Sequence, residues 1–260
     1  MLPFETLVVG YLAFFVLAAP FAHVERRKQA STALTAMSVA IAVFLAARTF
    51  PVDMRLWLGF LYIAIGYWIP VPLVPPARGG VFEGWLRRTD AALRRKVAHV
   101  PRWLHSALQL GYLACFPLLP TTFAVVWTAG STADVARYWL AVLAAGYACY
   151  ITLPWLVSRP PRLLDGTAAD VAHGAVTRLN HVVLGRVSHR LNTFPSGHVA
   201  VSVAAAIAAG KVWPAAGVVF VVVAAAVAVG AVAGRYHYVT DVVIGAGVGV
   251  TTSIAVTSGG

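Results

Sequence analysis

Asn192-Thr-Phe-Pro-Ser-Gly-His198 and Gly234-Arg-Tyr-His-Tyr-Val-Thr-Asp241 are the two stretches around which this chain is organised. Each places a histidine at the start of a long apolar run, among residues that can bind an anion. Between His198 and His237 lie 38 residues (199 to 236), which extend about 57 Å as α-helix, close to twice the roughly 30 Å of bilayer hydrocarbon. The spacing therefore predicts one excursion across a membrane and back, which returns both histidines to the same face.

The composition is that of an integral membrane protein. Hydrophobic residues make up 60% of the 260-residue chain and charged residues only 11%, with a mean hydropathy of +0.78. The apolar residues fall in runs of about 17 to 25, which is the length that an α-helix needs to cross a bilayer. We predict an all-α membrane protein with about eight transmembrane helices (six to eight). The predicted spans cover about 4–22, 31–50, 56–73, 103–127, 135–157, 199–210, 215–233 and 237–256.

Two other segments have the pattern of amphipathic helices that lie on a bilayer surface. Residues 80–99 place apolar side chains at helical spacing opposite five basic ones, and 176–191 repeat this pattern directly before the first histidine stretch. Pro117 and Pro120 predict a kink in the span 103–127. We divide the chain into N-terminal membrane helices with the first amphipathic helix, 1–102, and a catalytic membrane core, 103–260.

The charge balance indicates anionic partners. The net charge is +11, from 20 Lys plus Arg against 9 Asp plus Glu, which favours anionic headgroups or phosphorylated substrates. The basic residues lie in short loops between apolar runs, so we predict no nucleic-acid partner. Cys115 and Cys149 both lie in apolar runs and predict neither a disulfide nor a zinc site. The expected partners are a phosphorylated lipid substrate and bilayer lipids, and the sequence does not predict an oligomeric state.

The two histidines fit a catalytic pair. His237 and Asp241 are four residues apart and therefore share one face of a predicted helix. The carboxylate can accept a hydrogen bond from one ring nitrogen and leave the other nitrogen as a nucleophile. His198 supplies a second imidazole that can protonate a departing alkoxide.

The surrounding residues suit a phosphoryl group. Ser196 and Gly197 lie at the start of a predicted helix, which is a natural anion site. Arg159, Arg162 and Arg235 can each present a guanidinium fork to phosphate oxygens. No acidic cluster suited to magnesium lies nearby, so we expect metal-independent chemistry and no cofactor.

These residues resemble a known family. Pro195-Ser-Gly-His198 before an apolar helix, and His237-Tyr-Val-Thr-Asp241 opening the next helix but one, look like the second and third signatures of the type 2 phosphatidic acid phosphatase (PAP2) superfamily. Arg159-Pro160 looks like the end of its first signature, and the resemblance covers about 159–249.

By that resemblance the fold has a PAP2-like helical core and the protein is a lipid phosphate or diphosphate phosphatase, with phosphatidic acid and isoprenyl diphosphates as the expected substrate types. His237 would form a phosphohistidine, Asp241 would orient it, and His198 would act as general acid and later activate water. The phosphoryl oxygens would be held by Arg159, Ser196, Gly197 and Arg235.

Two departures from the family pattern keep alternatives open. Thr152 stands where the first signature usually has a lysine, a loss that Arg162 can compensate. Ala231 stands where the third signature usually has its arginine, while Arg235 precedes His237 by only two residues. That spacing resembles the branch related to inositol phosphorylceramide synthases, so transfer of a phosphoryl-headgroup to a lipid or polyol alcohol is the first alternative. A non-catalytic transporter or scaffold is the second.

The membrane side of the active site is predicted in two opposite ways. The predicted spans place 16 of the 20 basic residues on the active face, and only Arg48, Arg55, Arg137 and Lys211 on the other. The positive-inside tendency then puts the active face of this multi-pass cell-membrane protein in the cytoplasm, whereas the resemblance implies an external or luminal site.

Overall fold

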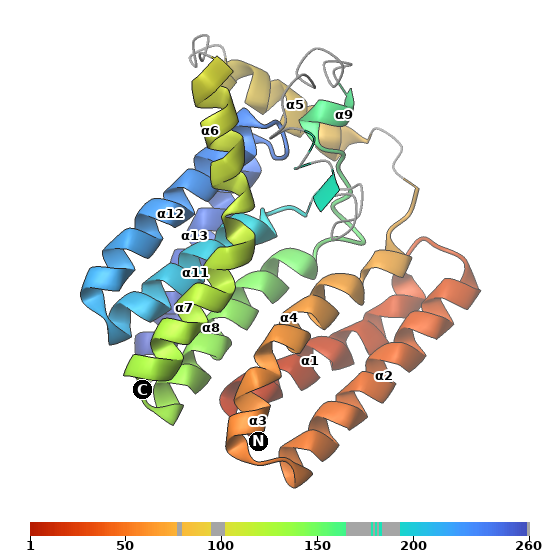
Figure 1. The fold of residues 1–260 in the computed structure, drawn as a ribbon. Helices are drawn as coiled ribbons and strands as arrows, with labels where there is room; N and C mark the ends of the chain where they lie inside the picture. Colours follow the sequence, from red (N-terminus) through yellow and green to blue (C-terminus); the bar gives the residue numbers. More distant parts are fainter. Residues whose placement is uncertain are drawn as a thin grey trace.

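The computed structural model describes residues 1–76, 80–94, 102–164, 178, 180, 182–183 and 193–258. In these residues the protein is a bundle of helices (Figure 1). The elements of the first half are α1 (Pro3–Ala18), η1 (Ala19–Phe21), α2 (Arg26–Thr49), α3 (Val52–Trp57), α4 (Gly59–Trp68), η2 (Val71–Leu73), α5 (Val81–Arg94), α6 (Arg102–Leu113) and α7 (Cys115–Ala129). They are followed by α8 (Thr132–Tyr150), α9 (Pro161–Leu164), α11 (Gly197–Val212), α12 (Pro214–Ala233) and α13 (Val239–Ser258).

The prediction of a membrane-embedded, all-helical protein is confirmed over the residues that the structure describes. Among the described residues, five helical segments are long and apolar enough to cross a membrane, or six if α6 and α7 form one broken span. They do not include α8, or α11 with its 16 residues. The predicted count of eight crossings is therefore not confirmed, although a helix lies near each of the eight predicted ranges.

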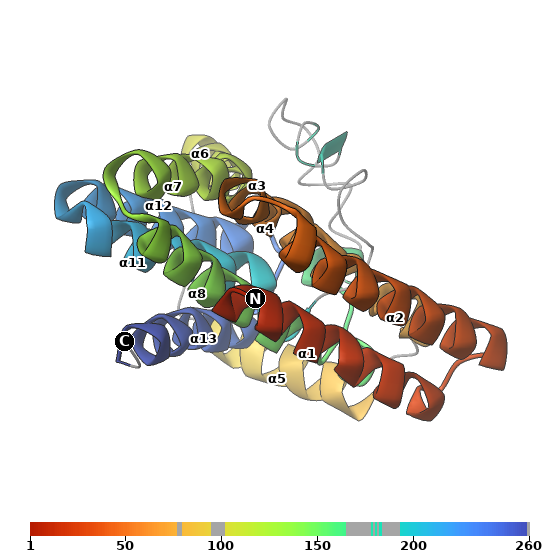
Figure 2. The same cartoon turned by 90° about the horizontal axis from the view of Figure 1, so that it is seen from below.

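Helix α8 lies at the centre of the bundle, between the group of α1, α2 and α4 and the group of α11, α12 and α13 (Figure 2). It begins at a capping box, in which Ser131 accepts from the Asp134 N–H and Asp134 accepts from the Ser131 N–H. It ends at Tyr150, seven residues before the predicted end at 157. Pro154 explains the difference, because it has no N–H for the carbonyl of Tyr150 and its ring clashes with that carbonyl in a continuous helix.

The predicted kink near the two prolines occurs as a bend of 46° between α6 and α7, at Ala114. Pro117 has no N–H to give to the carbonyl of Leu113, so the helix breaks one turn before the proline rather than at it. Pro120 lies inside α7 without ending it.

The N-terminal helices are joined to the core by aromatic and ionic contacts. The ring of Tyr11 on α1 stacks on Tyr147 of α8 at 4.0 Å between ring centroids. The Arg55 guanidinium pairs with the fully buried Glu5 through Nε–Oε1 and Nη2–Oε2 distances of 2.8 and 2.5 Å. A buried pair of this kind fixes the register of α1 against α3, because either charge alone would be costly inside the bundle.

The excursion predicted between the two histidines is present as the α11–α12 hairpin. The two helices meet so closely that a Cβ on Gly217 would lie 2.3 Å from the Cα of Gly210. Helix α13 then returns along α11, and Cβ atoms on Gly245 and Gly249 would lie 2.6 and 2.5 Å from the carbonyl oxygens of Ser196 and Ala200. Small residues at these positions allow the helices to approach closely. The α11 N-terminus, the α12 C-terminus and the α13 N-terminus therefore share one end of the bundle.

The predicted amphipathic helix at 80–99 is confirmed over Val81–Arg94, and the rest of that range lies outside the described residues. The second predicted amphipathic helix, at 176–191, lies outside the described residues apart from four positions. Helix α5 lies with α9 at the end of the bundle opposite to the N-terminus (Figure 1).

Candidate active site

The two histidines come together at the end of the bundle that carries α5. His198 is the second residue of α11, and His237 lies in the turn between α12 and α13. Their ring centroids are 6.1 Å apart, so one phosphoryl group could contact both rings. The Nδ1 atom of His237 lies 3.1 Å from Oδ2 of Asp241, and the two side chains are only 5% and 0% exposed. This contact leaves Nε2 as the ring nitrogen that can meet a substrate.

The loop before α11 is tied to the same carboxylate-bearing helix. The Ser196 N–H donates to the main-chain carbonyl of Asp241 at 3.0 Å. The Gly197 N–H donates to Oγ1 of Thr193 at 3.1 Å. This N–H, which we predicted to donate a hydrogen bond to phosphate, therefore already has an acceptor in the structure. A Cβ on Gly197 would lie 2.5 Å from Cε1 of Tyr150. Glycine is therefore required at 197 for packing against α8, in addition to any contact with a substrate.

Several buried polar atoms in the segments that carry the candidate site have no hydrogen-bond partner within the described part of the chain, and two of them could donate to an anion. These two are Oγ of Ser196, whose residue is fully buried, and Nη1 of Arg162. Buried polar groups are nearly always hydrogen-bonded, and each exception calls for an explanation. A hydroxyl and a guanidinium N–H that both lack acceptors fit a site that receives an oxyanion.

Arg162 is held in place by an aromatic stack. Its Cζ atom lies 4.3 Å from the ring centroid of Tyr236, and the ring of Tyr236 stacks on Tyr112 of α6 at 4.5 Å. Tyr112 in turn lies 5.7 Å from the ring of His198. Burial disfavours the charged guanidinium and lowers the pKa of Arg162. An anion beside Nη1 would offset that cost.

Arg235 has an unusual backbone conformation. Helix α12 ends in a Schellman motif, in which Tyr236 N–H donates to the Ala231 carbonyl and Arg235 N–H to the Val232 carbonyl, both at 3.0 Å. The residue in the left-handed position of this motif is usually glycine, but here it is Arg235, with φ of 57°, while Gly234 precedes it at φ of −76°. A strained non-glycine residue is typical of functional sites. The Arg235 carbonyl also accepts from the Arg162 N–H at 3.1 Å, so the two arginines lie side by side.

Arg159 is engaged by a carboxylate of α5. Its Nε and Nη2 atoms donate to Glu83 at 3.0 and 2.7 Å, and its main-chain N–H donates to the same carboxylate at 3.0 Å. These bonds hold the pKa of Glu83 below its ordinary value. The pair leaves Nη1 of Arg159 outside it. Arg159 therefore anchors α5 through Glu83 and could still donate from Nη1 to a phosphate.

Helix α5 makes two further contacts with the signature segments. The buried Asp90 accepts from the Val239 N–H at 3.0 Å, at the start of α13. The ring of Phe82 meets the ring of Phe194 edge-on at 4.9 Å. Together with Glu83, these residues connect α5 to the first and third signatures and to the residue directly before the second. The helix is thus a wall of the site as well as a basic surface helix.

Thr152 occupies the position of the missing lysine and remains close to the site. Its hydroxyl donates to the carbonyl of Phe194, directly before Pro195, and its oxygen also lies 2.8 Å from the Cys149 carbonyl. The residue therefore supports the backbone of the second signature by a neutral contact.

Sequence reasoning found the histidines, the aspartate and the arginines, but it missed Glu83, Asp90 and Tyr112. A signal for the first two was present. Glu83 and Asp90 are seven residues apart, and so they share one face of an otherwise basic helix. Tyr112 has no distinguishing pattern, since it is one aromatic residue in an apolar run.

One of the comparisons with known proteins found a match. Residues 134–259 match the family described as the PAP2 superfamily. Searches of curated proteins and of solved structures found no match to the chain. The matched region begins in the first turn of α8 and contains the histidine pair, the aspartate and the three arginines. The match to the PAP2 superfamily is carried by residues 134–259, and members of that superfamily are generally phosphoric ester hydrolases.

Proposed function

We propose that the protein is a metal-independent lipid phosphate or diphosphate phosphatase that acts through a phosphohistidine. The observation that carries the proposal is the pair of histidines with ring centroids 6.1 Å apart, of which His237 is held by Asp241. The segments around them also carry two donors without acceptors, Ser196 Oγ and Arg162 Nη1, as expected of a site that receives an oxyanion.

The geometry supports a two-step reaction. The Nε2 atom of His237 attacks phosphorus while Asp241 holds the Nδ1 side of the ring, and the bond to the leaving oxygen breaks as His198 protonates that oxygen. In the second step His198 takes a proton from water, the water oxygen bonds to phosphorus, and the N–P bond breaks. Arg162, Arg235, Arg159 and Ser196 stabilise the phosphoryl oxygens, and the Gly197 N–H would join them by exchanging Thr193 Oγ1 for a phosphoryl oxygen. Such stabilisation is where most of the catalysis of phosphoryl transfer arises.

A phosphorylated lipid fits the surroundings as substrate. The site lies at one end of a bundle with five or six candidate membrane spans, between a surface helix and the helix ends. A phosphate on a lipid tail would reach this level with its tail in the bilayer. Phosphatidic acid and isoprenyl diphosphates are the substrates to test first.

The test is phosphate release by the purified full chain and by His237→Ala, with exposed His23→Ala as the matched control. We expect His237→Ala to lose release by at least 10³-fold, the order expected when a covalent nucleophile is removed. His23→Ala should keep wild-type turnover. Unchanged turnover in His237→Ala would exclude the proposal and favour a non-catalytic transporter or scaffold.

Transfer to an alcohol is the second candidate, because Arg235 precedes His237 by two residues and occupies a strained position beside it. Adding lipid or polyol alcohols to the assay separates the two reactions. Release of inorganic phosphate that is insensitive to the alcohol supports hydrolysis. A stable phosphorylated alcohol, formed at the expense of free phosphate, supports transfer.

A further inference from the structure

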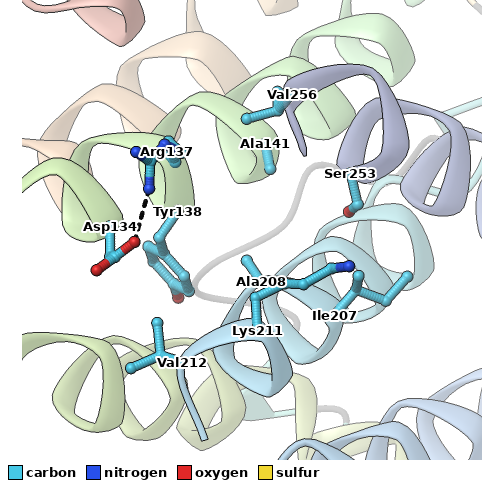
Figure 3. Close-up of a pocket in the computed structure, with 10 residues that line it drawn as sticks. All are labelled: Asp134, Arg137, Tyr138, Ala141, Ile207, Ala208, Lys211, Val212, Ser253 and Val256. Atoms are coloured by element: carbon cyan, nitrogen blue, oxygen red, sulfur yellow. Dashed lines mark hydrogen bonds and ion pairs between the residues drawn. The ribbon is translucent and has the colours of Figure 1, made fainter. Parts of the chain in front are cut away.

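A pocket of about 310 Å³ opens at the other end of the bundle, between α8, α11 and α13. Its lining includes Asp134, Arg137, Lys211, Ser253, Ile207 and Val256 (Figure 3). Lys211 follows His198 by 13 residues on α11, which is about 20 Å along a helix axis. The pocket is therefore separate from the candidate active site.

The polar side of the pocket carries a net positive charge. Nη1 of Arg137 lies 2.7 Å from Oδ1 of Asp134, whose other oxygen accepts from the main-chain N–H and the hydroxyl of Ser131. Asp134 is thus occupied by the helix cap and by Arg137. Lys211 is exposed, and no hydrogen bond or ion pair engages its ammonium among the residues that the structure describes. One Asp against one Arg and one Lys leaves a single positive charge.

The two cations are concentrated at this site. The sequence places four basic residues at this end of the bundle, and the other two are Arg48 and Arg55. Arg55 is buried against Glu5, and Arg48 lies over the ring of Phe44 at 5.0 Å. The remaining pair, Arg137 and Lys211, lines one pocket.

The rest of the pocket lining is mostly apolar. Ala141, Ala208, Ile207, Val212 and Val256 supply alkyl side chains, and the Ser253 hydroxyl is turned onto its own helix, where it donates to the Gly249 carbonyl at 2.8 Å. Figure 3 shows the charged groups of Asp134 and Arg137 on one side and Lys211 with Ile207 on another. A ligand that fits must combine one negative charge with an apolar part.

We propose that this pocket binds an anionic phospholipid from the leaflet opposite to the active site. The phosphodiester carries one negative charge, which Arg137 and Lys211 can neutralise from two sides. The first carbons of an acyl chain would lie against Ile207 and Val256. A free phosphate ion would leave the apolar part of the pocket unfilled, and a zwitterionic lipid would bring a second cation beside Lys211.

The test uses the full chain in lipid nanodiscs with a phosphatidylglycerol that carries a photoactivatable group on its acyl chain. After irradiation, adducts are mapped by mass spectrometry of peptides. We expect adducts on 207–212 and 253–256. Unlabelled phosphatidylglycerol should suppress these adducts at a concentration at least tenfold lower than the concentration of phosphatidylcholine or glycerol phosphate that has the same effect. Lys211→Gln should lose at least tenfold of the adduct yield, Lys211→Arg should retain it, and Arg48→Gln is the matched control from the same end of the bundle.

Each outcome decides the proposal. Unfolding temperatures of the three variants within about 2 °C of wild type show that a lost adduct is not caused by misfolding, and Arg137→Gln repeats the test if Lys211→Gln does not fold. Equal competition by phosphatidylcholine overturns the charge selectivity. Equal competition by glycerol phosphate overturns the requirement for a tail. Adducts spread over all helices, with no change in Lys211→Gln, overturn the site itself.

Discussion

Replacing Glu83 by glutamine tests whether α5 is part of the catalytic machinery. The substitution keeps the size of the side chain and one acceptor oxygen but removes the charge that faces Arg159. The Glu83 side chain is 5% exposed and that of Arg159 is 36% exposed. Loss of one partner costs about 3–5 kcal/mol in a fully buried ion pair and about 0–1 kcal/mol in an exposed one. We therefore expect Glu83→Gln to weaken the docking of α5 by about 2 kcal/mol.

A change of about 2 kcal/mol corresponds to roughly a 30-fold change in an equilibrium constant. If the docked helix is needed for turnover, kcat/KM for phosphate release should fall by up to roughly 30-fold. The assay is phosphate release from phosphatidic acid in vesicles, with the exposed Glu25→Gln as a control for the same substitution at the same face. Asp90→Ala removes the α5 contact to Val239 without touching Arg159. A fall in both variants identifies docking as the cause, and a fall in Glu83→Gln alone identifies the orientation of Arg159.

Wild-type kcat/KM in Glu83→Gln, together with an unfolding temperature equal to that of Glu25→Gln, would refute this reasoning. The helix would then be a passive surface element, and its buried carboxylates would have no energetic role. An unfolding temperature that falls without any change in kcat/KM would show that α5 stabilises the fold but does not shape the site.

Three further predictions concern the same end of the bundle. Arg235→Gly should raise the free energy of unfolding by about 1 kcal/mol, because glycine removes the left-handed strain, while kcat falls; a variant that is more stable and fully active would contradict a role in catalysis. Gly197→Ala should lower kcat at least tenfold, since the new Cβ would lie 2.5 Å from the Tyr150 ring, whereas Gly247→Ala, with nothing within 4 Å, should be neutral in both turnover and unfolding temperature. The lowered pKa of Glu83 means that its contribution to stability is complete above the unfolded pKa of about 4.3 and is lost as the pH falls through the lower folded value. The difference in unfolding temperature between wild type and Glu83→Gln should thus be constant from pH 7 to 5 and shrink in more acidic buffer; a difference that shrinks already at neutral pH would contradict the pairing.

Much of the fold follows from local physics that the sequence displays. Apolar runs predict the spans, and the 38-residue interval predicts the α11–α12 hairpin because helix rise and bilayer thickness are both fixed. The helix ends were less predictable. Pro154 ends α8 one turn before itself, and Pro117 moves the α6–α7 break back to Ala114. Steric exclusion by proline acts on the preceding turn, which a hydropathy pattern does not register.

The candidate site was predictable where its residues lie close in the sequence, as for His237 and Asp241. It was not predictable where the contacts are long-range. Glu83 meets a residue 76 positions away, and Asp90 meets one 149 positions away. Charge on an amphipathic helix does not specify such partners, because solvent could satisfy the same carboxylates equally well. The docking of α5 is a property of the folded bundle alone.

Helix α5 has one further consequence. Its inner face holds Glu83 and Asp90 in the site, while Arg87 and Arg88 are exposed on the outside, at the level expected for lipid headgroups. The 14-residue helix α5 therefore links the charge of the bilayer surface to the positions of the reacting groups. Turnover measured in neutral detergent should differ from turnover in a charged bilayer even at equal substrate concentration, so the lipid composition of the assay is itself an experimental variable for this protein.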